Sequence, residues 1–262
     1  MLNILRLGLS GITVSNLRNK VTASNVSNIN TIGYKKRRVE LSEVNLRSSK
    51  ILRQNLSKSF YSPTVSSFNR GVKVQGISVI NTKGPIYETS NQTDLVIDGD
   101  GYFRIDLGNG RTAYTRNGAL KVSSEGTLVT NDGYNLEPAI TIPQTAKSII
   151  INNDGTVQAE IEGESQMVNI GQIMLSRFPN PNGLKGIGSN LYERTMASGE
   201  PVIGSPGEEG FGKIFQGYLE DSNVDLAQEQ VNLIIDQRTF EANVNIVKTA
   251  DQIMKTIIDI KR

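Results

Sequence analysis

ASNVSNINTIGYKKRR, residues 23–38, joins the end of a helical pattern to four consecutive cations. Upstream of it, apolar residues recur at three- and four-residue spacing, which predicts a helix over about residues 3–29. Asn, Ser and Thr fill the interior of this helix, and their side chains compete with the helix for backbone groups. Such a helix is marginal alone and needs a packing partner. Gly33 is a stop signal after it.

The other end of the chain carries a longer and more regular helical pattern. Five apolar residues recur there at a strict interval of seven: Leu226, Leu233, Phe240, Val247 and Met254. We predict one helix over about residues 224–260, which at about 1.5 Å per residue spans roughly 55 Å. Because that length exceeds the width of a small domain, the helix protrudes or joins a bundle, and its heptads favour coiled-coil packing.

Between the two helices the composition changes to short β-rich runs separated by turns. The turns are Gly-Asn, Asn-Gly, Glu-Gly and Asp-Gly pairs, and Asn153-Asp154-Gly155 marks a hairpin. Evenly spaced short strands without intervening helices favour an antiparallel sandwich or barrel-like domain. The predicted fold class is therefore α+β, with long terminal helices pairing as a coiled-coil-like bundle, a central antiparallel all-β domain and extended connectors. Its parts are a helical domain (1–33 with 224–262), a connector (34–70 with 212–223) and a β-rich domain (71–211).

Composition and charge exclude several classes of function. The formal net charge is only +2 over 262 residues, which gives no global field for holding nucleic acid or anionic lipid. The chain has no Cys and no His, which removes disulfides, thiolate nucleophiles, most zinc and copper sites and the commonest general base. No apolar run approaches the length of a membrane span. The first residues loosely resemble a signal peptide but lack a small-residue cleavage site, so no cleaved signal is expected.

The positive charge is concentrated near the start of the chain. Residues 1–50 carry 9 cations and 2 acids, a net +7, whereas residues 221–262 carry 5 cations and 7 acids, a net −2. The run Lys35–Arg38 is consistent with a nucleic-acid arm, a lipid patch, or a solvated or inter-chain charge face. Because Glu40 and Glu43 follow at once and no aromatic array accompanies the cations, we favour the charge face.

Four acids, Glu88, Asp94, Asp98 and Asp100, form a sequence cluster of the kind that a glycosidase uses as a carboxylate pair. Asp98 and Asp100 lie in a Gly-rich turn, however, where Asp is common for conformational reasons, so a structural role is favoured. The sequence contains neither calcium-loop ligand spacing nor a Gly-rich phosphate-binding motif. We expect no catalytic residues, no cofactor and no metal.

Both ends of the chain carry motifs of a known family. The first, LSGITVSNLRNKVTASNVSNINTIGYKKRR, resembles the N-terminal signature of the flagellar rod and hook axial proteins, in which an Asn-rich helix runs into N-x-x-T-x-G-[FY]-K-[KR]. The second, QGYLEDSNVDLAQEQ, resembles the family's G-[YF]-x-E-x-S-N-V-[ND] motif before a C-terminal heptad helix. Middle segments such as DLVIDGDGYFRI look like the β domain of rod subunits, so the resemblance covers nearly the whole chain. One departure is local: the usual pair of Asn residues is Ser24-Asn25 here.

The resemblance implies a structural, non-enzymatic subunit of the flagellar rod, which spans the periplasm in the basal body, exported without a cleaved signal peptide. Its copies would form a helical tube that transmits torque from motor to hook, with the terminal helices inside, around an export channel, and the β domains outside. The implied partners are copies of itself, proximal rod proteins, hook protein, bushing-ring proteins and the flagellar type III export apparatus, without nucleic acid or membrane insertion. Length favours a distal rod subunit; the alternatives are a proximal rod paralogue or, in another class, a β-domain carbohydrate-binding or hydrolytic protein with helical arms.

Two groups of residues are candidate sites under this interpretation. The first group comprises helical interface positions: Leu5, Leu9, Ile12, Leu17, Val21, Asn25, Asn28, Leu226, Leu233, Phe240, Val247 and Met254. The second group comprises the signature turn and connector: Asn30, Thr31, Gly33, Tyr34, Lys35, Lys36, Gly217, Tyr218, Ser222 and Asn223. We expect the Asn residues to hydrogen-bond between chains and to fix their register, as buried polar residues do in coiled coils.

Overall fold

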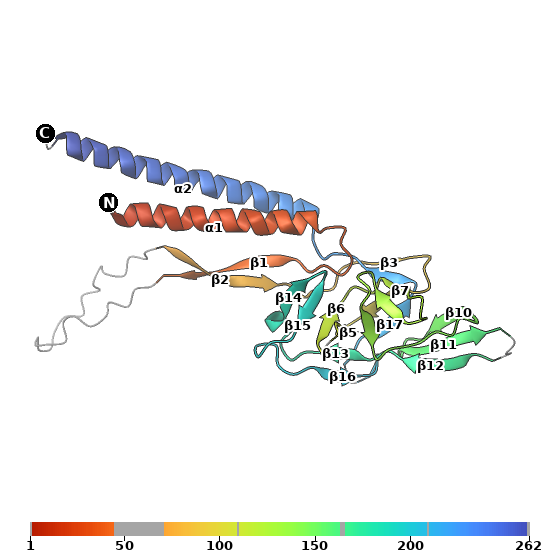
Figure 1. Ribbon diagram of the computed structural model, residues 1–262. Helices are drawn as coiled ribbons and strands as arrows, with labels where there is room; N and C mark the ends of the chain where they lie inside the picture. Colours follow the sequence, from red (N-terminus) through yellow and green to blue (C-terminus); the bar gives the residue numbers. More distant parts are fainter. Residues whose placement is uncertain (1, 45–70, 109, 163–165, 209, 261–262) are drawn as a thin grey trace, which may run out of the picture. The chain divides into compact units, whose positions relative to one another are not determined.

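The computed structural model describes residues 2–44, 71–108, 110–162, 166–208 and 210–260 (Figure 1). Its fold class is α+β, with an N-terminal helix, a C-terminal helix and strands that pair mostly antiparallel. The chain divides into two compact units. The helical unit comprises the described residues of Met1–Val26, Arg37–Ser78 and Leu226–Arg262, and the β unit those of Ser27–Lys36 and Val79–Asp225. Most of the connector expected over residues 34–70 lies outside the described residues.

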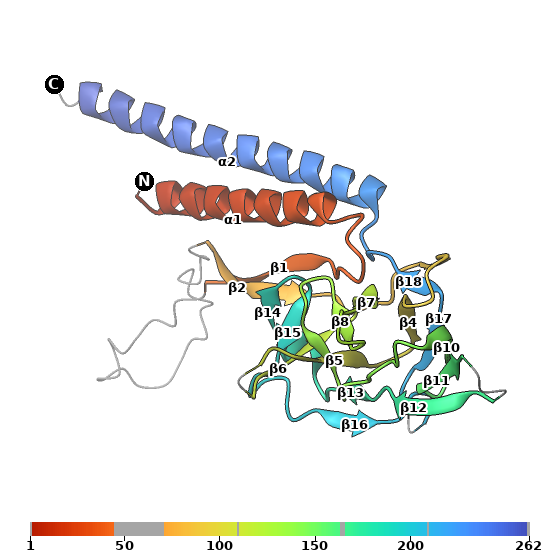
Figure 2. The same cartoon turned by 45° about the vertical axis from the view of Figure 1, so that its right-hand side comes forward.

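The helical unit contains α1 (Leu2–Ser27) and α2 (Leu226–Ile260), which lie side by side in both views (Figure 1, Figure 2). The predicted spans, 3–29 and 224–260, agree with these helices to within two residues at each end, so both predictions are confirmed. Over the described residues, neither helix combines the length and the apolar character that crossing a membrane requires.

A two-stranded sheet accompanies the helices. It consists of β1 (Arg37–Glu43) and β2 (Val72–Val79), which belong to the helical unit except for Val79. Ser78 Oγ donates a hydrogen bond to Glu40 Oε1 at 2.7 Å across the two strands. Part of the stretch expected to be an extended connector is therefore a paired strand, because a ladder satisfies the backbone groups that an extended chain leaves open.

The β unit is built on one large sheet and three small ones. The large sheet has the order β14-β15-β6-β5-β9-β8-β7, and β13 joins β5 to β16. A second sheet has the order β10-β11-β12, and β17 pairs with β4 and β18 with β3. The bounds are β3 Ile86–Glu88, β4 Leu95–Asp98, β5 Tyr102–Asp106, β6 Thr112–Thr115, β7 Leu120–Val122, β8 Leu128–Thr130, β9 Asn135–Glu137, β10 Ala146–Ile151, β11 Thr156–Ile161, β12 Val168–Gln172, β13 Leu175–Arg177, a 3-10 turn Pro181–Gly183, β14 Lys185–Gly188, β15 Leu191–Glu193, β16 Val202–Gly204, β17 Lys213–Gln216 and β18 Tyr218–Glu220. Residues 213–216 and 218–220, which we expected in a connector, thus form two strands.

The core of the β unit is centred on β5, which pairs with β6, β9 and β13. Phe103 and Ile105 on β5 and Leu175 on β13 are 0% exposed. Arg104 and Asp106, the alternate residues of β5, are half-buried and exposed, which is the period of two that a strand imposes on its side chains. The alternation places Phe103 and Ile105 in this core, while Tyr102 packs in a separate aromatic cluster with Tyr114 and Phe178.

The predicted hairpin at Asn153-Asp154-Gly155 is confirmed as the turn between β10 and β11. Gly155 has a φ of +81°, a left-handed conformation that glycine adopts without strain. Asp154 Oδ1 accepts a hydrogen bond from the backbone N–H of Thr156 at 2.9 Å. This bond stabilises the ionised carboxylate and lowers the pKa of Asp154 below its ordinary value.

Phe103→Ala should lower the free energy of unfolding of the β unit by about 3–5 kcal/mol, because it removes a ring from a fully buried site. Urea denaturation followed by circular dichroism measures the loss. Val122→Ala is the matched control, since the Val122 side chain is 43% exposed, and it should change the free energy by less than about 0.5 kcal/mol. Equal losses in the two variants would contradict the placement of Phe103 in the core.

Candidate functional site

The two sequence signatures meet in the β unit, although they come from opposite ends of the sequence. We call the place where they meet the signature junction, made of residues 33–36, 80–84 and 217–223. The Gly33 N–H donates a hydrogen bond to the backbone oxygen of Glu220 at 2.8 Å. The first and the last of these segments are thereby joined backbone to backbone.

The Glu220 carboxylate is the centre of the signature junction. Its Oε1 accepts hydrogen bonds from Lys35 Nζ at 2.5 Å and from the Gly84 N–H at 2.9 Å. Its Oε2 lies 3.2 Å from Arg116 Nε, within ion-pair distance but without hydrogen-bond geometry. The side chains of Glu220, Lys35 and Arg116 are 1%, 1% and 7% exposed. Two cations therefore share one buried carboxylate.

Burial changes the ionisation of Lys35. Removal of its ammonium group from water lowers the pKa of Lys35 below its ordinary value, and Arg116 lowers it further. The charge of Glu220 and its hydrogen bond act in the opposite direction. Lys35 Nζ also donates to the backbone oxygen of Thr82 at 2.8 Å. The ammonium group is thus held by a carboxylate and a carbonyl in place of water, as a buried charge requires.

Asn223 connects three segments of the signature junction. Its Oδ1 accepts a hydrogen bond from the Lys36 N–H at 2.7 Å, and its Nδ2 donates to the backbone oxygens of Ile80 and Thr82 at 2.8 and 3.0 Å. A side-chain amide both donates and accepts, whereas a carboxylate only accepts. Asn therefore suits this position, because Asp would remove the donor that the half-buried carbonyl group of Ile80 receives here.

The N-terminal signature turns sharply at Gly33. Its φ is +67°, and a Cβ at this position would lie 2.9 Å from the backbone carbon of Arg116. Glycine suits this position because it adopts a positive φ without strain and has no Cβ to clash with the Arg116 backbone. Tyr34, next to it, is buried. Before the turn, Thr31 Oγ1 donates to Asn28 Oδ1 at 3.2 Å, and Asn30 is exposed.

The C-terminal signature residues have local structural roles. The Gly217 N–H donates to the backbone oxygen of Asp94 at 2.8 Å. Tyr218 is half-buried in β18. Ser222 is buried, and its Oγ accepts a hydrogen bond from the Val224 N–H at 3.3 Å. These bonds hold the segment that leads into α2.

The expectation that Lys35–Arg38 form a solvated or inter-chain charge face is wrong for Lys35. Its side chain is buried, and its acid partner Glu220 belongs to the same chain. Lys36 is half-buried, and Arg37 and Arg38 are exposed. Because Glu220 is 185 positions away, the local pattern of charges holds no sign of the pair.

In the helical unit, α1 and α2 contact each other through what we call the polar seam. The residues of α2 on the seam recur every seven positions: Glu229, Asp236, Asn243 and Ala250. Asn25 Nδ2 donates to Glu229 Oε2 at 3.1 Å. Arg18 Nε lies 3.0 Å from Asp236 Oδ1. The helices are therefore antiparallel, and polar pairs set their register.

Small residues on α1 allow the two helix backbones to approach closely. A Cβ added to Gly11 would lie 2.4 Å from Asn243 Oδ1, and one added to Gly8 would lie 2.5 Å from a Val247 methyl group. Protein interiors are densely packed, so a side chain at Gly8 or Gly11 would force the two helices to shift. The interface thus depends on close approach and polar pairing.

Asn25, for which we expected hydrogen bonds between chains, makes them within this chain. Besides its bond to Glu229, its Nδ2 donates to the Arg37 backbone oxygen and its Oδ1 accepts the Arg37 N–H, each at 2.9 Å. One amide therefore ties α1 to α2 and to the start of β1.

The apolar heptad of α2 lies beside the polar seam. Leu233, Val247 and Met254 are half-buried, and Leu226 and Phe240 are exposed. The interface candidates on α1 are Val21, which is buried, Leu5, Ile12 and Leu17, which are half-buried, and Leu9, which is exposed. A further row of apolar side chains, each at least 42% exposed, runs along one side of α2 at helical spacing. We call it the exposed α2 face: Val231, Ile235, Ile246, Ile253, Ile257 and Ile260.

Two of the four clustered acids stabilise local structure. Asp94 is buried and accepts hydrogen bonds from Thr89 Oγ1 at 2.8 Å and Asn91 Nδ2 at 3.0 Å. Asp98 forms an ion pair with Lys83 at 2.5 Å. Across the described parts of the chain, no three or more Asp or Glu side chains gather in a way that suits a metal ion. Glu88 and Asp100 are exposed.

Comparisons with known proteins match both units. The family model of the flagellar hook protein FlgE/F/G D1 domain matches residues 96–159, and that of the flagellar basal body rod FlgEFG protein C-terminal matches residues 216–260. The flagellar basal-body rod protein FlgG of Caulobacter vibrioides is 39% identical over 252 residues, which cover 96% of this chain and 96% of that protein. FlgG of Bacillus subtilis is 38% identical over 268 residues and 100% of both chains. The flagellar hook protein FlgE of Salmonella typhimurium is 43% identical over 119 residues, 45% of this chain and 29% of that protein.

Matches in the β unit and at the C-terminal end mark a protein of the flagellar rod and hook class. Since the identity to rod proteins extends over nearly the whole length, the chain belongs to the FlgG family of flagellar basal-body rod proteins. It is a structural subunit of the distal rod. Membership indicates association with copies of itself and with other flagellar axial proteins.

Lys35→Met should lower the free energy of unfolding of the β unit by about 3–5 kcal/mol, because it leaves a buried carboxylate without its closest cation. Urea denaturation of the purified protein measures the loss. Lys83→Met is the matched control, since the Lys83–Asp98 pair is exposed and its removal should cost less than about 1 kcal/mol. If the two variants lose the same stability, the junction does not depend on the buried pair.

Asp236→Asn should change how the stability of the α1–α2 pair depends on pH. Burial raises the pKa of Asp236 and Glu229 adds to this, whereas Arg18 opposes it. A carboxyl group with a raised pKa stabilises the folded state fully below its ordinary pKa of 3.8, and this contribution is lost as pH rises through the folded-state value. Relative to Asp236→Asn, the wild type should therefore lose stability as pH rises from 3.8 towards neutrality.

Urea denaturation at several pH values, followed by circular dichroism at a helical wavelength, measures this difference. Asp251→Asn is the control, because Asp251 is exposed on the same helix and pairs with Lys255. A wild type and an Asp236→Asn variant with the same dependence on pH would show that Asp236 is not buried in the seam.

Proposed function

We propose that copies of this chain polymerise into a helical tube that carries torque from the motor to the hook. A contact between two different surfaces of the same chain repeats without closing and therefore generates a helical filament. In this proposal the terminal helices, residues 1–33 with 224–262, line the inside of the tube around an export channel. The β-rich domain, residues 71–211, lies outside, and residues 34–70 with 212–223 connect the layers.

The observation that carries the proposal is the exposed α2 face. Val231, Ile235 and Ile246 lie on it together with isoleucines nearer the end of the helix, and all are substantially exposed. A row of exposed apolar side chains on one side of a helix marks a site of interaction with another molecule. Because the polar seam already covers a different side of α2, this face remains for a second copy.

The helical interface candidates fit this arrangement. Leu9, Leu226 and Phe240 are exposed apolar residues on the two helices, and their burial between copies would contribute about 25 cal/mol per Å². We infer that the antiparallel α1–α2 pair of each copy packs on its neighbours as a coiled-coil-like bundle. Leu5, Ile12, Leu17, Leu233, Val247 and Met254, which are half-buried, complete the contact surface.

The location and partners follow from the same proposal. The rod would span the periplasm, and the chain would reach it through the flagellar type III export apparatus. Proximal rod proteins, hook protein and bushing-ring proteins would contact the assembled tube.

Ile253→Asp should abolish tube formation or raise the concentration needed for it at least tenfold, since a charge on the exposed α2 face must lose its hydration at the interface. Electron microscopy and sedimentation of concentrated protein measure assembly. Gln252→Asp introduces the same charge at the neighbouring exposed position and should assemble normally. Tubes formed equally well by both variants would rule out this face as the interface between copies.

A further inference from the structure

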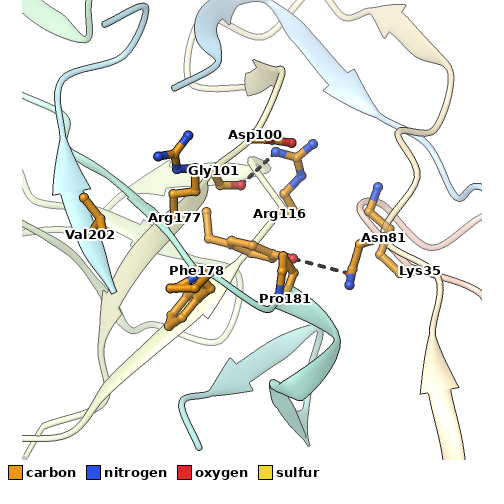
Figure 3. A pocket seen from close by; sticks show the side chains of 11 residues that line it. Lys35, Asn81, Asp100, Gly101, Arg116, Arg177, Phe178, Pro181 and Val202 are labelled. Atoms are coloured by element: carbon orange, nitrogen blue, oxygen red, sulfur yellow. Dashed lines mark hydrogen bonds between the residues drawn. The ribbon is translucent and has the colours of Figure 1, made fainter. Parts of the chain in front are cut away.

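An open pocket of about 450 Å³ lies in the β unit beside the signature junction. Its walls include the aromatic rings of Tyr102 and Phe178 and the side chain of Pro181. Figure 3 shows Phe178 and Pro181 at the pocket, together with Asp100, Gly101 and the side chains of Arg116 and Arg177. The pocket therefore combines apolar walls with several cations.

The cations of the pocket exceed its acids. Lys35, Arg116 and Arg177 line it, and Asp100 is the one acid among the lining residues. Lys35 and Arg116 are the two buried cations that share Glu220, and Glu220 itself does not line the pocket. The buried cluster thus carries an uncompensated positive charge, and both of its cations face the cavity.

Arg177 adds a third positive charge to the pocket, and its guanidinium group contacts an aromatic ring. Its guanidinium lies 5.5 Å from the centre of the Phe211 ring, a cation–π contact. Within the described portions of the chain, no carboxylate lies at ion-pair distance from it. Arg116, in contrast, is fixed by Glu220 and by the backbone oxygens of Gly99 and Gly101, each 2.8 Å from its Nη1.

A positive surplus in partly buried surroundings is costly unless an anion lies near it. Apolar walls reduce the local dielectric constant, which strengthens the attraction for such an anion. A guanidinium group offers a carboxylate a planar fork of donors, so a carboxylate suits Arg177 well. The chemistry of the pocket therefore favours a carboxylate as its occupant.

We propose that this pocket receives a carboxylate side chain from the β unit of a second copy of the chain. The inference rests on the proposed polymerisation, which supplies the second copy. Exposed acids are available on the β unit, for example Glu125 in the turn between β7 and β8. A pocket and an inserted acid are two different surfaces, so their contact repeats from copy to copy in the head-to-tail manner of a filament. It links β units and is independent of the exposed α2 face.

The first test uses Arg177→Lys, which keeps the charge and provides an amine for zero-length carbodiimide coupling to a carboxylate in contact with it. Isotopically light and heavy copies are mixed, polymerised and coupled, and the linked peptides are identified by mass spectrometry. We expect position 177 of one copy to be joined to an Asp or Glu of the other label. Links from position 177 to Asp100 of the same copy alone, or no links, would overturn the proposal, since the pocket then neutralises its own charge.

The second test compares Arg177→Glu with Lys121→Glu, a control that reverses an exposed charge on β7, outside the pocket. We expect Arg177→Glu to raise the concentration needed for tube formation about tenfold, and Lys121→Glu to leave it within twofold. If the wild type and both variants assemble alike, the carboxylate pocket is refuted while the polymerisation proposal stands. If the wild type forms no tubes at all, it is the polymerisation proposal that fails. Should Arg177→Glu not fold, the conservative Arg177→Lys experiment decides alone.

Discussion

The buried ion pair between Lys35 and Glu220 holds together parts of the chain that are far apart in sequence. The chain passes from one compact unit to the other after Val26, Lys36, Ser78 and Asp225. The segments of the signature junction lie next to the last three of these positions, and the pair fixes them against one another. Without it, the three segments of the signature junction would keep only their hydrogen bonds to Asn223 and backbone bonds such as Gly33 to Glu220, so the packing of this part of the β unit depends on the pair.

In the helical unit, α1 and α2 contact each other mainly through polar side chains, whereas the exposed surface of α2 carries a row of apolar side chains. The polar seam pairs Asn25 with Glu229 and Arg18 with Asp236, and polar pairs are specific for one register. Apolar side chains are less selective, and α2 keeps many of them on another side. The polar seam therefore sets the register of α1 against α2, and the apolar side chains on the other side of α2 remain for contact with another copy of the chain.

Local patterns predicted the two helices, the hairpin at Asn153-Asp154-Gly155 and the antiparallel character of the β unit, since each depends on residues close in sequence. They did not predict the role of Lys35, because its partner lies 185 positions away. The polar seam was hidden for a related reason. Glu229, Asp236 and Asn243 repeat every seven residues, but polar residues at helical spacing look like a solvated face until the opposite helix is known. The pocket, too, is assembled from distant segments and has no signal in any one of them.

The contacts of Glu220 involve only a few segments of the β unit, which bears on where such a protein can gain or lose residues. Hairpins such as β7–β8 and the sheet β10-β11-β12 lie between β3 and β17 in sequence, and none of their residues contributes to the contacts of Glu220. Material inserted into or removed from these hairpins would leave the anchor untouched. Changes of length in these hairpins would therefore alter the size of the β unit and leave the contacts of Glu220 intact.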